Sequence, residues 1–212
     1  MQQTKSFISF GHANSGLVFN EESHQKFPLR YYNVINGEGM VPDPDCSYFV
    51  FVYQGSATLF IKNGINAILP KDAYFSIHGQ FLLTGDFKAV CIEVICSGGQ
   101  FKENKYKAYT TIGGPIEATG RLKYIDGCTD SLLIPPVKKG DPCLNHLHFP
   151  SSIVQTAHTH PSHRIGIVAS GSGECVTPFG NLPLVEGCIF VIKEHDGQEV
   201  AEGLDGELHD AG

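Results

Sequence analysis

Two segments of this 212-residue chain share one spacing of short apolar runs and glycine turns. The first segment covers residues 51–77 and the second covers residues 167–192. The corresponding positions are Gly55 and Gly171, Ser56 and Ser172, Gly64 and Gly180, and Ile77 and Ile192. Each copy predicts four strands joined by turns, so the repeat indicates a duplicated β architecture. Two unrelated hairpins that share glycines by chance are the alternative.

Runs rich in β-branched and aromatic residues continue along the chain, and 24 glycines and 12 prolines separate them. No long helical period is visible. The predicted strands cover residues 29–35, 48–53, 57–62, 65–69, 73–77, 88–95, 131–134, 144–149, 153–157, 164–169, 173–177, 182–185 and 188–192. Strands at this density predict an all-β sandwich or barrel.

The charge balance excludes some classes of partner. Lys and Arg number 15 against 22 Asp and Glu, which gives a formal net charge of −7. Nucleic acids and anionic membranes need a basic surface, so we expect neither as a partner. No apolar stretch approaches the roughly 18 residues of a membrane span. The seven scattered cysteines contain no Cys-x-x-Cys pair, which indicates a reducing compartment and a cytoplasmic location.

Five of the ten histidines cluster in one part of the chain, at His146, His148, His158, His160 and His163. Residues two apart on a strand share a face, so each His-x-His pair is expected to point to one side. Neutral imidazole is the commonest metal ligand, and the pairs predict a site for a divalent Fe, Mn, Zn, Ni or Co ion. Hydrogen-bonded core histidines are the alternative interpretation.

The run from His158 to Gly173 resembles the first motif of the cupin superfamily, which is His-x-His, three or four residues, Glu, six residues and Gly. Pro161 fits that motif, and residues 184–192 resemble the start of the second cupin motif. The resemblance covers about residues 130–200 well and about residues 28–96 more weakly. It implies a bicupin: an all-β chain of two double-stranded β-barrels of the jelly-roll type, with a metal in the lumen.

The repeat and the resemblance together predict three parts. A degenerate N-terminal cupin barrel is expected over residues 1–97, a linker over 98–125, and a metal-binding C-terminal barrel over 126–212. No closing apolar strand is evident after Ile192, so the C-terminal barrel is expected to be incomplete. A neighbouring chain or residues 1–20 would then cover its free edge, or the sequence is a fragment of a longer protein.

The resemblance assigns the metal ligands only in part. The His-x-His pair of the motif falls on His158 and His160, and the motif glutamate falls on Arg164. A guanidinium is always protonated and cannot bind a cation. His163 is therefore the predicted third ligand, and His148 is an alternative. The missing glutamate would leave coordination positions open for substrate or water.

Two further positions depart from the cupin pattern. The histidine of the second motif would fall near Gln198, where the nearest imidazole is His195. In the N-terminal copy, Pro42 and Pro44 occupy the positions of the histidine pair, and Tyr48 takes the position of the arginine. We expect this barrel to lack a metal and to serve packing or dimerisation.

Arg164 has two interpretations. It could point into the lumen and bind a carboxylate or phosphate with its guanidinium group, or it could lie solvated at the barrel rim. A predicted substrate pocket combines it with His146, His148 and Gln155, and His146 or Tyr124 could serve as an acid or base.

The sequence thus predicts a metal-binding cupin protein. It would be a metal-dependent enzyme of the dioxygenase, lyase or isomerase type that acts on a small polar or anionic molecule. A non-catalytic bicupin that binds a small molecule is the alternative, and a purely structural barrel is the third hypothesis. The expected partners are a small-molecule ligand and a second copy of the chain in a homodimer. The sequence names no substrate and no catalytic residue.

Overall fold

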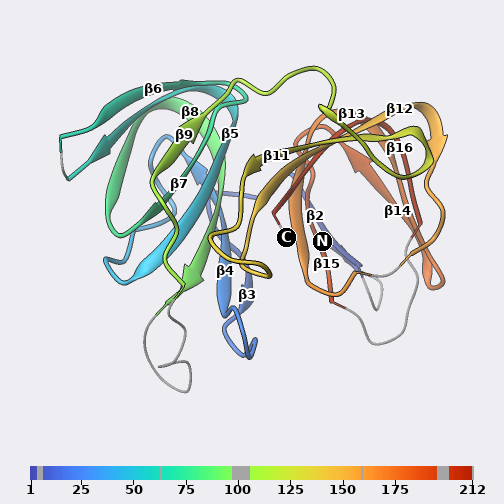
Figure 1. Cartoon of the computed structure of the whole chain (residues 1–212), viewed down its shortest axis with the longest axis horizontal. Coiled ribbons are helices and arrows are strands. Elements are labelled where there is room, and N and C mark those ends of the chain that lie inside the picture. Colours follow the sequence, from blue (N-terminus) through green and yellow to red (C-terminus); the bar gives the residue numbers. More distant parts are fainter. Residues whose placement is uncertain (4–6, 63, 97–105, 159, 195–200, 212) are drawn as a thin grey trace. The chain divides into compact units, whose positions relative to one another are not determined.

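The computed structural model describes residues 1–3, 7–62, 64–96, 106–158, 160–194 and 201–211, the last range as backbone only. These residues divide into two compact units, each built on one β-sheet (Figure 1). Unit 1 contains Met1–Ala13, Glu117–Pro135 and Pro142–Gly212, and unit 2 contains Asn14–Ile116 and Pro136–Asp141.

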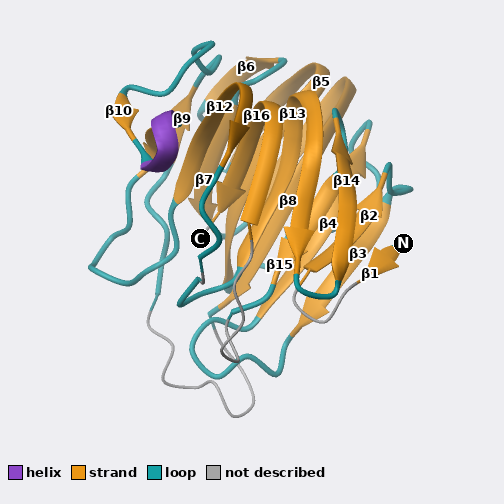
Figure 2. Cartoon of the chain, turned by 90° about the vertical axis from the view of Figure 1, so that its right-hand side faces the viewer, coloured by secondary structure: helices purple, strands orange, loops and turns teal. Residues whose placement is uncertain are grey.

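Strands dominate both units, and in the described part of the chain the helical structure is the 3₁₀ turn η2 (Ile125–Gly127) (Figure 2). The predicted all-β class is therefore confirmed. None of the described residues forms a helix with the length and apolarity that a membrane crossing requires.

Unit 2 is a seven-stranded antiparallel sheet. Its strands are β3 (Gly16–Glu21), β4 (Leu29–Ile35), β5 (Cys46–Ile61), β6 (Asn66–Pro70), β7 (Tyr74–His78), β8 (Phe81–Ile95) and β9 (Thr111–Gly113). The order is β3-β4-β8-β5-β7-β9, and β6 also pairs with β5.

The long strands β5 and β8 form the centre of the unit 2 sheet. They pair with each other along almost their full lengths, with a register shift between Val52 and Gln54. Strand β7 pairs with the first half of β5, at Ser47–Phe51, and β6 pairs with the second half, at Ser56–Phe60. Because a bulge bends a strand, β5 can contribute to two walls around one core.

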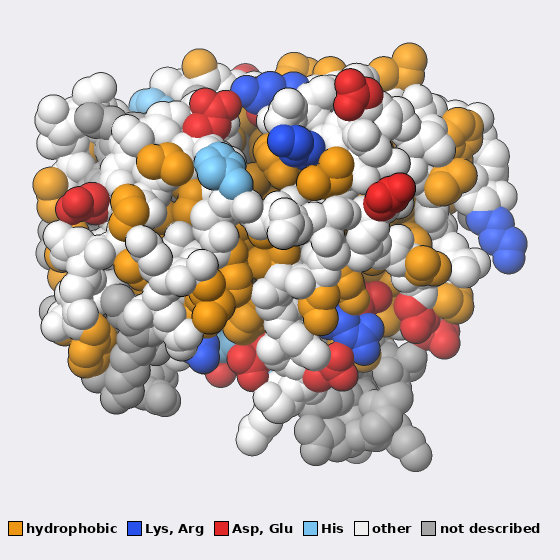
Figure 3. Space-filling model, turned by 180° about the vertical axis from the view of Figure 1, so that it is seen from behind, with side chains coloured by type: hydrophobic (Ala, Val, Ile, Leu, Met, Phe, Trp, Pro, Cys, Tyr) orange, Lys and Arg blue, Asp and Glu red, His pale blue; other side chains and the backbone are white. Residues whose placement is uncertain are grey.

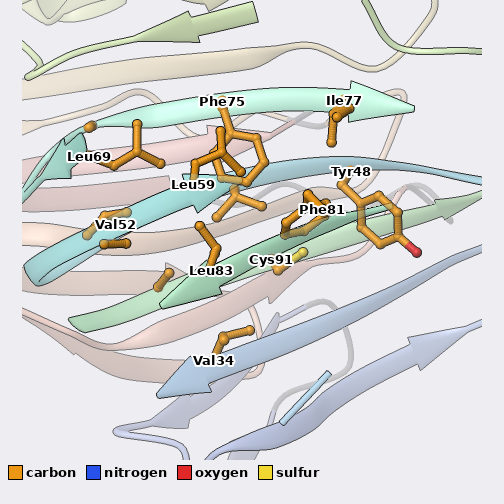
Figure 4. Packing of buried hydrophobic residues seen from close by; sticks show 14 of the residues in the cluster. Val34, Tyr48, Val52, Leu59, Leu69, Phe75, Ile77, Phe81, Leu83 and Cys91 are labelled. Atoms are coloured by element: carbon orange, nitrogen blue, oxygen red, sulfur yellow. The ribbon is translucent and has the colours of Figure 1, made fainter. Parts of the chain in front are cut away.

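Apolar side chains fill the interior of unit 2 (Figure 4). Phe81 lies between two other rings, with centroid distances of 5.1 Å to Phe75 and 5.2 Å to Tyr48, both edge to face. Burial of each such side chain stabilises the fold by about 1.5–3 kcal/mol. The interior of unit 2 is thus occupied by its own side chains.

Among the described residues of unit 2, Glu93 is a buried carboxylate. Glu93 is 2 % exposed, and its two oxygens accept hydrogen bonds from Arg30 Nη1 at 2.9 Å, Tyr48 Oη at 2.7 Å and Tyr32 Oη at 3.3 Å. Burial and the Glu93 charge raise the pKa of Tyr32 to about 12. Burial, followed by the Glu93 hydrogen bond, raises the pKa of Tyr48 well above its ordinary value. These partners satisfy the charge of Glu93 within the protein.

Unit 1 is a nine-stranded antiparallel sheet that curves into a nearly closed barrel (Figure 1). Its strands are β1 (Gln2–Gln3), β2 (Phe7–Gly11), β10 (Leu122–Lys123), β11 (Thr129–Ile134), β12 (Leu144–Val154), β13 (Arg164–Thr177), β14 (Gly180–Val185), β15 (Ile189–Ile192) and β16 (Ala201–Ala211). The order is β1-β2-β15-β13-β16-β12-β11-β10, and β14 also pairs with β13.

Two strands complete the sheet that the sequence analysis expected to be incomplete, namely β16 and β2. Strand β16 follows Ile192 and pairs with both β12 and β13, although its sequence is not an apolar run. A strand held by backbone hydrogen bonds on both sides does not need an apolar sequence. Strand β2, from the first residues of the chain, pairs with the free edge of β15.

The pairing of β2 with β15 places Met1–Ala13 in the same compact unit as the C-terminal strands. The division into residues 1–97, 98–125 and 126–212 stays a prediction, and residues 97–105 lie outside the described part of the chain. On the face in Figure 3, acidic and basic side chains are interspersed with apolar ones.

Candidate ligand site in unit 1

The inner side of the unit 1 sheet is defined by an apolar core cluster. Its buried members are Phe7, Cys128, Phe149, Val168, Cys175, Leu182, Leu184, Cys188, Phe190 and Ile192, and Tyr124, Leu147 and Ile153 pack against them. The rings of Phe7 and Phe190 are stacked at 5.8 Å, which ties β2 to β15. Tyr124, a predicted acid or base, lies beside this cluster, and its N–H donates to the carbonyl of Cys128.

Arg164 lies on this inner side. It is the first residue of β13 and pairs across the sheet with Ile192, which belongs to the core cluster. Val168, four residues along β13, belongs to the same cluster. Because alternate residues of a strand share a face, Arg164 lies on the side of the core. This position favours a lumen-facing arginine over a solvated one at the rim.

Arg164 holds His160 by a hydrogen bond. Its Nε donates to Nδ1 of His160 at 3.1 Å, and the His160 ring contacts the ring of His158 edge to face, with centroids 4.7 Å apart. Burial, the Arg164 charge and His158 together lower the pKa of His160 to about 4. His160 is therefore neutral near pH 7. Because its Nδ1 accepts a hydrogen bond, its proton resides on Nε2.

His158 has the opposite tautomer. Its Nδ1 lies 2.8 Å from the carbonyl oxygen of Thr156, which can only accept, so Nδ1 carries the proton. The N–H of Thr156 donates to Oδ2 of Asp126 at 2.6 Å, and this bond lowers the pKa of Asp126. Asp126 lies in η2 with a left-handed φ of 55°. The turn thus fixes the backbone that orients His158.

His163, the predicted third ligand, is linked to a residue that the sequence did not indicate. Its Nδ1 accepts a hydrogen bond from the N–H of Glu194 at 2.8 Å. A ligand atom of the Glu194 carboxylate lies within 4.8 Å of a ring nitrogen of His163. His163 precedes Arg164 directly, so strand alternation directs the two side chains differently.

The pair His146 and His148 lies on the other face of β12. Leu147 and Phe149, which alternate with these histidines, pack in or against the core cluster. Strand alternation therefore directs both imidazoles away from the inner side of the sheet. Burial and His148 lower the pKa of His146, which is fully buried, to about 4.

A short segment lies over that other face. The N–H of Gly120 donates to Oγ1 of Thr129 at 2.8 Å, and the N–H of Arg121 donates to Oγ of Ser131 at 2.9 Å. Thr129 Oγ1 also lies 3.3 Å from Nδ1 of His148. The two His-x-His pairs thus lie in separate environments, and the structure brings together His158, His160 and Arg164.

Two more polar side chains belong to the inner side. Asp130 pairs across the sheet with Leu147 and shares its inner face. Burial raises the pKa of Asp130, while the N–H of Ser131 and the Arg164 charge oppose the rise. Its Oδ1 is buried without a hydrogen-bond partner among the described residues. The sequence alone could not single out Asp130, because the signal is its register with Leu147.

Gln155, which the sequence placed in the pocket, is 2 % exposed. It continues the alternation from Ile153, which packs against the core cluster, through the exposed Val154. Its Nε2 is buried and has no hydrogen-bond partner in the described part of unit 1. Gln155 therefore has a buried donor on the inner side of the sheet. It follows Val154, which pairs with Gly203 of β16, and Gly203 pairs on its other side with Glu174 of β13, ten residues along the strand from Arg164.

These residues fit an anion better than a divalent cation. A metal-bound imidazole donates its other N–H to a carbonyl or carboxylate, as His158 does, whereas Nδ1 of His160 accepts from a cation. Metal binding by Nε2 of His160 would require that nitrogen to lose its proton beside a permanent positive charge. Gln198 and His195, near which a further ligand was predicted, lie outside the described residues.

Comparisons with known proteins give the fold. No family model and no curated protein sequence matches the chain. A cupin 2 conserved barrel domain protein from Leptotrichia buccalis has 11 % identity and a TM-score of 0.60, covering 100 % of this chain and 89 % of that one.

Two other solved structures have different functions in their names. A salicylate 1,2-dioxygenase from Pseudaminobacter salicylatoxidans has 12 % identity and a TM-score of 0.61, covering 96 % of this chain and 75 % of that one. An 11S globulin from Wrightia tinctoria, described with an auxin binding site, has 9 % identity and a TM-score of 0.62, covering 97 % and 83 %. The chain therefore has the fold of the cupin proteins.

Proposed function

We propose that unit 1 binds a small anionic molecule on the inner side of its sheet, with Arg164 as the main contact. The observation that carries this proposal is the position of Arg164 on the core side of β13, where its Nε is held by neutral His160. A guanidinium has five N–H donors in a planar arrangement that matches a carboxylate or phosphate. Partial burial strengthens such a pair relative to one in water.

The proposal includes a bicupin architecture in which each unit is a cupin barrel. In unit 2 the interior is filled by apolar side chains such as Phe75 and Phe81, which supports a structural role for it. Unit 1 keeps polar groups on its inner side, which supports a binding role. A cytoplasmic location is also proposed, in keeping with seven free thiols.

The neighbouring structures support a small organic ligand. One neighbour is named for salicylate, which is a carboxylate, and another is described with an auxin binding site. The same fold is thus found in a dioxygenase and in an 11S globulin, so the fold alone does not decide between catalysis and binding.

Metal-dependent catalysis is the second candidate. The observation that favours it is the hydrogen bond from Nδ1 of His158 to the carbonyl of Thr156, an arrangement typical of metal-bound histidine. It requires Arg164 to release His160, because that imidazole now has its proton on Nε2.

Metal analysis and ligand titration of the purified protein test these two candidates together. The protein is incubated with Fe(II), Mn, Zn, Ni or Co and desalted, and its metal content is measured by mass spectrometry. Benzoate, acetate and phosphate are titrated by calorimetry or NMR. We expect less than about 0.1 metal ion per chain, and carboxylate binding that Arg164→Ala weakens at least about tenfold.

Arg121→Ala is the matched control, since Arg121 is exposed and pairs with Glu117. It should bind carboxylates like the unchanged protein. One metal ion per chain that is lost in His158→Ala, together with no anion binding, would establish the metal-dependent candidate instead.

A further inference from the structure

We infer that unit 2 contains a carboxylate-binding site that the chain fills with its own Glu93. The inference follows from hydrogen bonds within unit 2, and it is independent of the ligand proposed for unit 1. It means that Glu93 acts as an internal ligand, and that removal of its side chain should open the site to a small monocarboxylate such as acetate.

Three donors surround the carboxylate of Glu93. Its Oε2 accepts from Arg30 Nη1 at 2.9 Å and from Tyr32 Oη at 3.3 Å, and its Oε1 accepts from Tyr48 Oη at 2.7 Å. Both oxygens are thus bound, one of them by a guanidinium, as in the recognition of free carboxylates by proteins. All three bonds go to the carboxylate group, so the same donors would recognise any carboxylate held there.

Two of these donors are held in place without Glu93. Nε of Arg30 donates to Oε1 of Glu22 at 2.7 Å, which gives the guanidinium a second anchor. Oη of Tyr48 accepts a hydrogen bond from the N–H of Asp43. A site whose donors are already oriented loses little conformational entropy when a ligand binds. The site is therefore prepared for a carboxylate from another source.

The site lies at the strand position that Arg164 has in unit 1. Tyr48 pairs across the sheet with Ile77, and Arg164 pairs with Ile192, which the repeat places in an equivalent position. Tyr48 pairs on its other side with Glu93, and its hydroxyl points away from the labelled apolar side chains (Figure 4). The equivalent position thus carries a hydrogen-bond donor in both units, and in unit 2 a neighbouring strand supplies the anion.

A small acid can reach this site once the glutamate side chain is removed. The side chain of Glu93 is 2 % exposed, but that of Arg30 is 31 % exposed, so the guanidinium connects the buried carboxylate with solvent. Glu93→Ala removes the Cγ and the carboxylate, which together have the size of acetate. It leaves a partly buried cation with one carboxylate fewer, which is unfavourable. An acetate ion should therefore fill the vacated space.

Chemical rescue of Glu93→Ala by acetate tests the inference. Every protein in the test also carries Arg164→Ala, which removes the main contact proposed for unit 1, so that the response to acetate reports on unit 2. Urea midpoints are measured in about 100 mM sodium acetate, and in the same concentration of sodium chloride with and without acetamide. Acetate, with a dissociation constant of about 1–10 mM, should restore at least about a third of the midpoint that Glu93→Ala loses. Chloride and the uncharged acetamide should restore none of it.

Glu117→Ala is the matched control, because the ion pair of Glu117 with Arg121 is exposed. Its midpoint should be the same in acetate and in chloride. Addition of Arg30→Gln to Glu93→Ala should weaken acetate binding at least about tenfold, since the ligand then lacks its cation. Glu93→Gln keeps the side-chain volume and leaves no vacated space, so acetate should not restore its midpoint.

If Glu93→Ala does not fold, Glu93→Ser with formate repeats the measurement, because serine replaces the Cγ and leaves room for a carboxylate alone. Equal midpoints in the acid and in chloride would show that the site accepts no external carboxylate. A response that is unchanged by Arg30→Gln would show that acetate acts elsewhere. Either result would overturn the inference, and neither concerns the function proposed for unit 1, which is tested in protein that retains Glu93 and Arg164.

Discussion

Arg164 donates a hydrogen bond from Nε to Nδ1 of His160 at 3.1 Å, so a permanent cation lies beside the imidazole that the cupin motif would assign to a metal. In that motif the position of Arg164 is a glutamate. The exchange reverses the charge at this position, and an anionic ligand becomes the natural complement of the site.

Removal of the Arg164 charge should raise the pKa of His160. Burial is the largest cause of the present value of about 4, and Arg164 is the second, so Arg164→Gln should restore only part of the shift toward the ordinary value near 6.5. NMR titration of the imidazole Cε1 proton measures it. Arg121→Gln should leave the His160 pKa as it is, and a pKa that stays near 4 in Arg164→Gln would refute the coupling.

The protein should lose stability in mild acid. The pKa values of His146 and His160 are both lowered to about 4, whereas an unfolded histidine titrates near 6.5. Between these values the unfolded state binds more protons than the folded state. The contribution of the two histidines to the free energy of unfolding is therefore fully present above about pH 6.5 and is lost as the pH drops toward 4. Each histidine contributes a slope of at most about 1.4 kcal/mol per pH unit.

Urea denaturation at several pH values measures this slope. In His146→Gln the free energy of unfolding should change less steeply between pH 6.5 and pH 4.5, by up to about 1.4 kcal/mol per pH unit, which corresponds to one proton. If the urea midpoint of the unchanged protein stays constant or rises as the pH is lowered from 6.5 to 4.5, the assignment of two neutral buried imidazoles is wrong.

Glu93 should be a strong determinant of the stability of unit 2. Glu93→Ala removes a carboxylate that is 2 % exposed and deprives Arg30, Tyr32 and Tyr48 of their shared acceptor. Breaking a buried pair typically costs about 3–5 kcal/mol, and Tyr48→Phe, which loses one hydrogen bond to a charge, should cost about 1.5–3 kcal/mol. Glu117→Ala is the control on an exposed ion pair and should leave the denaturation midpoint unchanged. Equal midpoints for Glu93→Ala and Glu117→Ala would refute this role.

Asp126 should control the tautomer of His158 from a distance. Its carboxylate holds the N–H of Thr156, whose carbonyl accepts the His158 Nδ1 proton. In Asp126→Ala this turn loses its anchor, and the Nδ1–H tautomer should no longer dominate, as ¹⁵N shifts of the ring would show. Asp126→Asn keeps an acceptor oxygen and should behave like the unchanged protein. An unaltered ring spectrum in Asp126→Ala would show that the turn does not need this side chain.

Gly55 and Gly171, which the glycine repeat places in equivalent positions, have the same type of backbone conformation. Gly55 and Gly171 have left-handed φ values of 75° and 82°, and a Cβ at Gly55 would lie 2.1 Å from the carbonyl oxygen of Asp86. The strands predicted from the sequence ended near these glycines, whereas the observed strands β5 and β13 continue through them. A glycine in a strand accommodates a bulge without ending it, and the sequence alone does not separate these outcomes.

The site was predictable only in part. The spacing of His158, His160 and Arg164 in the sequence was enough to group them. Strand alternation shows that His146 and His148 share a face, but which face is inner depends on the packing of Leu147 and Phe149. Asp130 became visible only through the register of β11 with β12.

Anomalous scattering from crystals grown with 4-bromobenzoate and zinc chloride would test the central claim most directly. Maps at the bromine and zinc absorption edges place the two probes independently. The structure predicts a bromine-labelled carboxylate within hydrogen-bond distance of Arg164 and no zinc between His158 and His160. A zinc ion bound by both imidazoles, with Arg164 turned away and no carboxylate near it, would contradict the account.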